Sequence, residues 1–260
     1  MFEDMPKPHT THTPVTVDFP LKGQWITPNT PGSRVPSHGT DLFGATYAYD
    51  FVGIDPESRS RRYYRPRLLH YLILGVRLHD WFGWGQPIYA ATAGTVIRAE
   101  DGMPERNPVH PLRDVPLRLK NARAFSSGTS RDYRRLTGNY VIVESDEGYV
   151  VYAHAQTGSI RVSTGDRVIP GQHLANVGHS GNSTAPHLHF QLMDHPDPWQ
   201  ATGLPCRFRH YERFHHGAWQ PVENGIPTTA DRIRRQEAVS YTHLRAHETV
   251  LDLVCRLLLE

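Results

Sequence analysis

Short apolar runs, separated at close intervals by turn signals, dominate the second half of the chain. In YAYDFVG (47–53), large apolar groups alternate with small or polar ones, as in a strand with one face on a core. DEG (146–148), TGD (164–166) and SGNSTAP (180–186) are turn signals. The pattern predicts strands at Val15–Trp25, Tyr47–Gly53, Pro87–Glu100 (two strands broken at Gly94), Asn139–Ser145, Tyr149–His154, Ser159–Val162, His173–Val177 and His187–Met193. Short, closely spaced strands favour an all-β fold with an antiparallel core.

Two polar insertions interrupt the predicted strands. Residues 55–86 are Arg-rich and then aromatic, and residues 101–136 contain LRLKNARAF, which predicts a short helix. Residues 1–14, rich in Pro, His and Thr, are expected to form a loose tail. We expect one domain over residues 15–238, with these two insertions as long loops.

The C-terminal string VSYTHLRAHETVLDLVCRLLLE (239–260) is not typical of an evolved protein segment. Its two blocks resemble, in one reading frame, the translation of a transposase-type sequencing adapter and of the constant sequence behind the sample index. The leucines also have the spacing of an amphipathic helix. The match over two separated blocks favours the adapter, so these residues are left out of the functional argument.

Composition and charge exclude several classes of protein. The chain is 38% hydrophobic and 21% charged, which argues against disorder. Its 28 basic and 26 acidic residues nearly cancel, so nothing indicates a nucleic-acid partner. The longest apolar run, Leu68–Val76, is too short to span a membrane. MFEDMPKPHT lacks the layout of a signal peptide, so a cytoplasmic protein is the default expectation, and we expect a monomer.

The sharpest chemical signal is the pair His187 and His189 in APHLHFQL. Residues i and i+2 of a strand share a face, so both imidazoles would project together while Leu188 and Phe190 enter the core. Two imidazoles on one face suit a divalent metal, most often zinc, although a solvated pair would have the same pattern. The 17 histidines of the chain offer further candidates.

His154 ends a predicted strand, and His38, Asp41 and Asp50 lie before and within another. A catalytic zinc site needs three protein ligands and one open position for water. Two histidines and one aspartate supply these ligands, and the spare histidines remain for proton transfer.

The ordered motifs YAH, GDRVIPGQ, GHSGNST and PHLHF resemble the lysostaphin-type (LytM-like) zinc metallopeptidases, many of which cut peptidoglycan peptide bridges. The resemblance runs from about Phe19 to Pro227. It is densest in PIYAATAGTVIRAEDG, GNYVIVESDEGYVVYAHAQ, VSTGDRVIPGQHLANVGHSGNSTAPHLHFQL and YAYDF. It implies the antiparallel β-sheet or sandwich core of that family, a duplicated hybrid motif, with long loop insertions.

The resemblance also implies roles for five residues. His38, Asp50 and His189 would hold one Zn²⁺ ion, and His154 and His187 would be the catalytic imidazoles.

One departure concerns the first ligand. The family places this histidine four residues before the aspartate, where this chain has Thr46, whereas His38 lies twelve residues before Asp50. A hairpin-like insertion would have to bring His38 back to the metal, and Asp41 is the alternative ligand.

The implied function is that of a zinc metalloendopeptidase, with peptide bonds of peptidoglycan cross-links or stem peptides as substrate. A zinc-activated water and two catalytic histidines would carry the hydrolysis. The alternative is a non-catalytic regulator or binding protein with the same fold. Degenerate copies of the fold lose ligands, whereas all five positions are filled here. The Arg-rich stretch RSRRYYRPR (59–67) is a candidate for binding an anionic polymer, although such runs are usually solvated loops.

Overall fold

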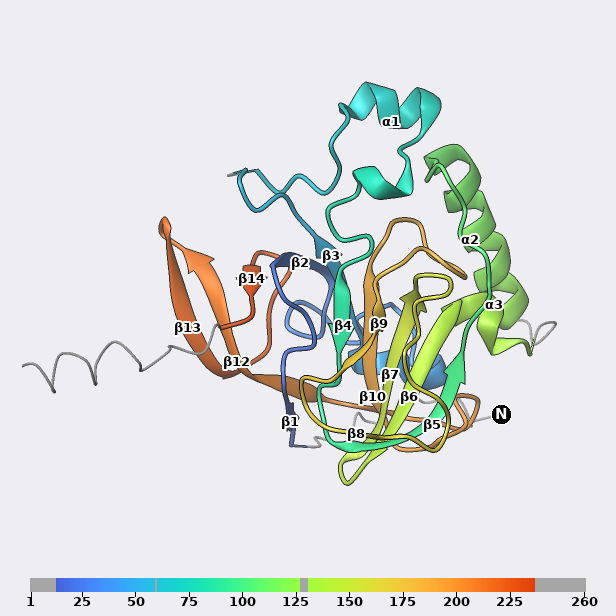
Figure 1. The fold of residues 1–260 in the computed structure, drawn as a ribbon, viewed down its shortest axis with the longest axis vertical. Helices are drawn as coiled ribbons and strands as arrows, with labels where there is room; N and C mark the ends of the chain where they lie inside the picture. Colours follow the sequence, from blue (N-terminus) through green and yellow to red (C-terminus); the bar gives the residue numbers. More distant parts are fainter. Residues whose placement is uncertain (1–12, 59, 127–130, 237–260) are drawn as a thin grey trace, which may run out of the picture.

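The computed structural model describes residues 13–58, 60–126 and 131–236. The expectations for most of the N-terminal tail and for residues 239–260 lie outside the described residues. Strands dominate the fold (Figure 1). They are β1 (Val15–Val17), β2 (Gln24–Asn29), β3 (Tyr49–Gly53), β4 (Pro87–Tyr89), β5 (Gly94–Glu100), β6 (Asn139–Ser145), β7 (Gly148–Ala155), β8 (Arg167–Val168), β9 (His173–Asn176), β10 (Leu188–Met193), β11 (Gly203–Leu204), β12 (Cys206–His215), β13 (Ala218–Gly225) and β14 (Arg232–Arg234). The all-β expectation is confirmed.

One large sheet holds most of these strands, in the order β1-β12-β14-β2-β3-β10-β7-β6-β5-β8. β11 is added beside β10 and β13 beside β12, while β4 and β9 form a separate two-stranded sheet. Neighbouring strands of the large sheet are antiparallel, except that β1 runs parallel to β12. β10 is therefore an interior strand, paired with β3 on one side and with β7 on the other.

The central strands have one face on the main hydrophobic core, and their other face carries a smaller apolar cluster beside the polar groups. On β10, Leu188 and Phe190 belong to the main core cluster, so His189 and Gln191 project from the opposite face. Asp50 lies between two buried aromatic residues of β3 and projects from the same polar face as His189. Strand alternation thus separates the core from the chemistry.

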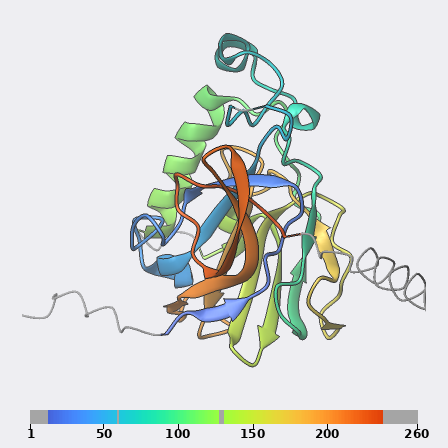
Figure 2. The same cartoon turned by 90° about the vertical axis from the view of Figure 1, so that its left-hand side faces the viewer.

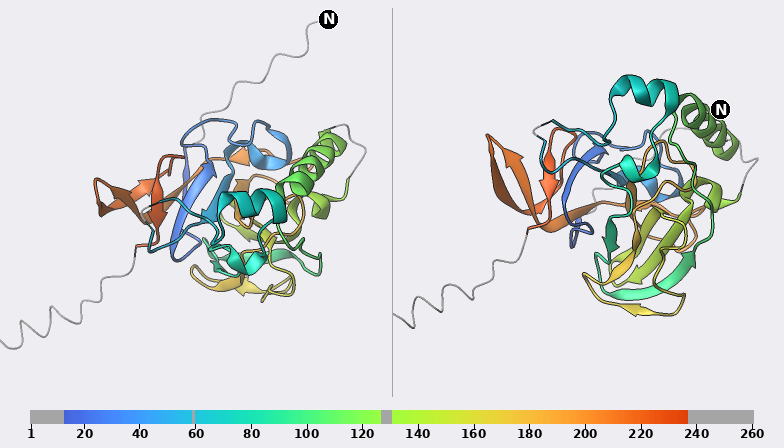
Figure 3. Two further views of the ribbon diagram at one scale, coloured as in Figure 1. Left: turned by 90° about the horizontal axis from the view of Figure 1, so that it is seen from above. Right: turned by 45° about the horizontal axis from the view of Figure 1, so that its top comes forward.

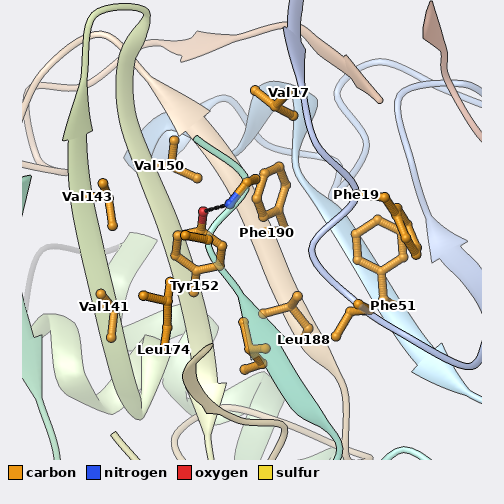
Figure 4. Packing of buried hydrophobic residues seen from close by; sticks show 14 of the residues in the cluster. Val17, Phe19, Phe51, Val141, Val143, Val150, Tyr152, Leu174, Leu188 and Phe190 are labelled. Carbon is orange, nitrogen blue, oxygen red and sulfur yellow. Dashed lines mark hydrogen bonds between the residues drawn. The ribbon is translucent and has the colours of Figure 1, made fainter. Parts of the chain in front are cut away.

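Aromatic side chains fill the core between the sheet and the β1–β2 segment (Figure 4). Phe19 packs edge-on against Phe51, with ring centroids 5.3 Å apart. The Tyr152 hydroxyl reaches through the same cluster and accepts a hydrogen bond from the backbone N–H of Ala91 at 2.7 Å (Figure 4). A buried bond of this kind contributes about 1 kcal/mol to stability and would leave an unsatisfied donor if it were lost.

The two insertions carry the helices. The first contains α1 (Leu68–Leu74) and a 3₁₀ helix at Leu78–Asp80, and the second contains α2 (Pro111–Ser126) and α3 (Tyr133–Thr137). α2 flanks the sheet, and α1 lies beside the start of α2 at one end of the molecule (Figures 2 and 3). Among the described helices, none is both long enough and apolar enough to cross a membrane.

The structure corrects several expected element bounds. Val15–Trp25 is not one strand: β1 ends at Val17 and β2 begins at Gln24, because Pro20 cannot donate to a ladder and Gly23 has a φ of +80°. Ser159–Val162 forms no strand: the backbone N–H of Ser159 donates within a turn to Gln156, and that of Arg161 donates to Leu174 on β9. The helix expected in LRLKNARAF is part of the longer α2.

The expected list of strands also omits β12, β13 and β14. β12 and β13 form a hairpin that projects from the body of the molecule (Figure 3), and many of its side chains are exposed. Exposure on both faces removes the apolar alternation by which a strand is predicted. Pro221 inside β13 also argues against a strand when only the sequence is considered.

Candidate metal centre

The pairing of β3 with β10 sets Asp50 directly opposite His189. His189 Nδ1 lies 3.0 Å from Asp50 Oδ1, and His187 Nε2 lies 3.4 Å from the same oxygen. His187 comes one residue before the start of β10. Both histidines of the HLH motif thus face one buried carboxylate.

The loop after β2 brings His38 to the same carboxylate. Within this loop, the backbone N–H of Ser37 donates to the carbonyl of Thr46 at 2.9 Å and closes the segment that carries His38. His38 Nε2 then lies 3.0 Å from Asp50 Oδ2. Ligand atoms of His38, Asp50 and His189 all lie within 4.8 Å of one another, whereas the alternative ligand Asp41 is exposed and outside this group.

A 3₁₀ helix at Leu42–Tyr47 holds this loop against the sheet. Gly44 has a φ of +73°, and a Cβ atom there would lie 2.9 Å from the Cβ of Met193 on β10. Only glycine fits both the conformation and this close approach. The loop is therefore anchored on the strand that carries His189.

Hydrogen bonds behind the ligands fix which nitrogens face inward. The Ser37 hydroxyl donates to the Ala45 carbonyl, so its oxygen accepts from His38 Nδ1, 3.0 Å away. His38 Nε2 is left without a hydrogen-bond partner although it is buried. This orphaned lone pair points to a cation as its natural partner.

Gln191 orients the ring of His189, as Ser37 orients that of His38. The amide nitrogen of Gln191 donates to the Phe43 carbonyl at 2.7 Å, so its Oε1 atom faces His189 Nε2 at 2.8 Å. Oε1 therefore accepts a hydrogen bond from Nε2–H of His189. Nδ1 of His189 is then free to share a cation with Asp50. Two imidazole nitrogens and a carboxylate converge, which is a donor set that suits zinc.

The electrostatics of the cluster favour an ionised Asp50. Burial opposes ionisation, but the His38 and His187 imidazoles, together with a hydrogen bond from His187, outweigh it and hold the pKa of Asp50 well below its usual value. Asn29 also donates to Asp50 Oδ2 at 2.7 Å. The carboxylate therefore presents a fixed negative charge to the inward-facing nitrogens.

His154 reaches the site through an irregularity in β7. Ala155 pairs with Asn139 and Ala153 with Tyr140, so His154 is an extra residue of a bulge, and its φ is +63°. Bulges re-aim side chains and are frequent beside active sites. The His154 ring accordingly lies 4.5 Å from the His187 ring, centroid to centroid, on the polar face of the sheet.

The two remaining imidazoles have opposite protonation preferences. Burial and the charges of His187 and His189 lower the pKa of His154 well below its usual value. Burial also opposes protonation of His187, but the Asp50 carboxylate outweighs it and raises the pKa of His187, while Arg118 opposes this rise. Two imidazoles whose pKa values are shifted in opposite directions therefore lie side by side, an arrangement that suits one base and one acid.

A buried polar network connects α2 to His187. The Asp114 side chain is fully buried, accepts from Arg106 at 2.8 Å and lies 3.7 Å from Nε2 of the buried His179. Nδ1 of His179 contacts the Ser183 hydroxyl at 3.0 Å, and this hydroxyl lies 3.2 Å from His187 Nδ1. These contacts link Asp114 to His187 through His179 and Ser183.

Sequence reasoning did not identify Asn29, Ser37, Gln191 or Asp114 as parts of this site. Gln191 carried a usable signal, because it lies two residues after His189 and so shares its face of the strand. Asn29 and Asp114 come from a strand end and from a helix far away in the chain, so their contacts depend on tertiary structure. Ser37 directly precedes His38, and the Ala45 carbonyl orients its hydroxyl.

Replacement of Gln191 by leucine is expected to weaken metal binding by about 10–100-fold, because His189 loses the acceptor that orients it. Metal affinity is measured by competition with a chromogenic chelator. Gln200→Leu, the same substitution at an exposed glutamine outside the cluster, is the control and should bind metal like the unmodified protein. Equal affinities in all three proteins would contradict the role assigned to Gln191.

A cavity of about 820 Å³ opens onto this cluster. It is lined by the five polar residues His38, Asp50, His154, His187 and His189, by Tyr63, Tyr71 and Trp81 of the first insertion, and by one face of α2. Side chains of both insertions thus form the walls of the cavity in front of the cluster.

Comparison with known proteins gives local matches. Residues 120–201 match the family described as Peptidase family M23. The peptidoglycan DD-endopeptidase ShyC of Vibrio cholerae is 36% identical over 62 residues, which cover 24% of this chain and 14% of that protein. Endolysin 2638A of Staphylococcus phage 2638A is 36% identical over 75 residues, covering 26% of this chain and 15% of the endolysin. The matched regions are thus a small part of the length of either relative.

Among solved structures, the catalytic domain of lysostaphin from Staphylococcus simulans is similar with 17% sequence identity and a TM-score of 0.33, over 73% of this chain and 88% of that domain. His154, His187 and His189 lie inside the family match, and His38 and Asp50 precede it. Residues 120–201 are thus similar to peptidase family M23, and this match includes the motifs YAH, GDRVIPGQ, GHSGNST and PHLHF.

Proposed function

We propose that this protein is a zinc metalloendopeptidase that hydrolyses peptide bonds in peptidoglycan cross-links or stem peptides. The observation that carries the proposal is the convergence of His38 Nε2, His189 Nδ1 and the Asp50 carboxylate, with the protons of both imidazoles engaged by outer partners. A bound zinc ion supplies a Lewis acid and lowers the pKa of a water molecule to about 7.

His154 is the general base in this proposal. Its Nδ1 atom donates to the Ser180 carbonyl at 2.9 Å, which leaves Nε2 as an acceptor. Its lowered pKa keeps the ring neutral. Nε2 can therefore take the proton of the attacking water as the oxygen bonds to the carbonyl carbon.

His187 is the complementary acid. Its Nδ1 atom donates to the Ala185 carbonyl at 2.7 Å, and Nε2 carries a second proton when Asp50 raises the pKa of the ring. A protonated Nε2 can stabilise the oxyanion and then protonate the leaving amine as the C–N bond breaks.

The names of the two curated relatives support peptidoglycan as the substrate, since one is a peptidoglycan DD-endopeptidase and the other a phage endolysin. The cavity in front of the cluster is large enough to receive a peptide segment.

Purified protein incubated with peptidoglycan should release fragments with new amino termini, detected by mass spectrometry. Removal of metal with a chelator should stop the release, and added Zn²⁺ should restore it. Undiminished cleavage by metal-free protein would refute zinc dependence. Bound zinc without any cleavage would favour the non-catalytic regulator.

A further inference from the structure

One face of α2 forms a wall of the cavity. Residues 115, 118, 122 and 125 follow the helical spacing that brings side chains to a common face. All four line the cavity: Val115, Arg118, Ala122 and Phe125. Arg118 is thus a single charge in the middle of an otherwise apolar stripe that faces the candidate site.

The charge of Arg118 has no partner among the described residues. The nearby Arg106 and Arg113 both pair with Asp114. Arg118 contributes only its backbone carbonyl, which accepts from Asn182 Nδ2 at 3.4 Å. Its guanidinium is exposed and is available to a ligand in the cavity.

The charge balance of the cavity favours an anion. Apart from histidines, the charged residues among those that line it are Asp50 and Arg118. Asp50 is committed to the histidine cluster and to Asn29. Arg118 and His187 line the same cavity, so the positive charge of Arg118 faces the space in front of the reacting groups.

We propose that Arg118 binds a carboxylate of the substrate peptide, so that the preferred substrate is an acidic peptide held against α2. The inference rests on the proposed function and adds a specificity-determining residue to it. A guanidinium can bind a carboxylate through two parallel N–H···O bonds. The neighbours Val115, Ala122 and Phe125 carry no charged or hydrogen-bonding side chain that would compete with Arg118 for the carboxylate.

The carboxylate could be the C-terminus of the peptide or an acidic side chain. Three matched synthetic cross-linked peptides separate these sources: one with a free C-terminus and a glutamate, one with the C-terminus amidated, and one with glutamine in place of the glutamate. We expect the unmodified protein to show a kcat/KM roughly 10–100-fold higher for the acidic peptide than for one of the two amides, the effect of one charged hydrogen-bonded pair. The amide peptide that is cleaved with the lower kcat/KM shows which carboxylate Arg118 binds.

Arg118→Gln should bring this ratio of kcat/KM values close to one, and Arg118→Lys should retain part of it, because lysine keeps the charge without the planar fork. Arg123→Gln is the control, since Arg123 is exposed on α2 but does not line the cavity. It should preserve both the ratio and the activity.

Equal cleavage of all three peptides by the unmodified protein would overturn the carboxylate site while leaving the proposed function intact. An Arg118→Gln variant that keeps the full preference would overturn it as well. Failure to cleave any of the peptides or whole peptidoglycan would overturn the proposed function, and the carboxylate site with it.

Discussion

Replacing His189 with alanine is expected to abolish metal binding and peptide hydrolysis together. The change removes one of the three proposed ligands and leaves only His38 and Asp50 to hold the metal. This loss of metal affinity should be larger than the loss of about 10–100-fold that is expected when only the outer partner Gln191 is replaced. Zinc per protein chain, determined by elemental mass spectrometry, and kcat/KM on peptidoglycan peptides should fall in parallel.

The control for this change is His173→Ala. His173 lies on β9, where its Nε2 atom contacts the Ala175 carbonyl and the Asn176 side chain, and it does not line the cavity. Its removal should leave zinc content and activity unchanged. A His189→Ala variant with a full complement of zinc would refute the assigned ligand set.

Replacing His154 with asparagine is expected to lower kcat by about 10²–10⁴-fold while zinc stays bound, because the change removes the proton acceptor and leaves the three ligands in place. Asparagine is chosen because the φ of +63° at this position is left-handed, a conformation that asparagine tolerates better than alanine. Rate and zinc content are measured on the same preparation.

His187→Ala provides the companion test. It should also keep zinc and lose turnover, because His187 is assigned to proton transfer rather than to metal binding. If His187→Ala lost its zinc while His189→Ala kept it, the roles of the two histidines in the HLH motif would be reversed. If His154→Asn lost its zinc, His154 would belong to the ligand set.

The strands of the central sheet were predictable because they are buried. Asn139–Ser145 forms a strand with the bounds predicted, since its first five residues make a continuous buried run. The outer hairpin was not predictable, because its exposed strands need no apolar pattern and are held by pairing of their backbones. α1 was missed for a related reason: Leu69 is 68% exposed, so packing on a core does not explain its apolar side chain.

The pattern of apolar residues was sufficient to predict the antiparallel β core and the placement of His187 and His189 on one face, because strand periodicity follows from covalent geometry. Tertiary structure alone decided how His38 and His154 reach the cluster. Uninterrupted alternation would send His154 into the core beside Tyr152, and only the bulge against β6 turns it outward. His38 depends on a loop that closes on Thr46 and packs on β10. Such contacts join residues distant in sequence, and no local pattern of residues encodes them.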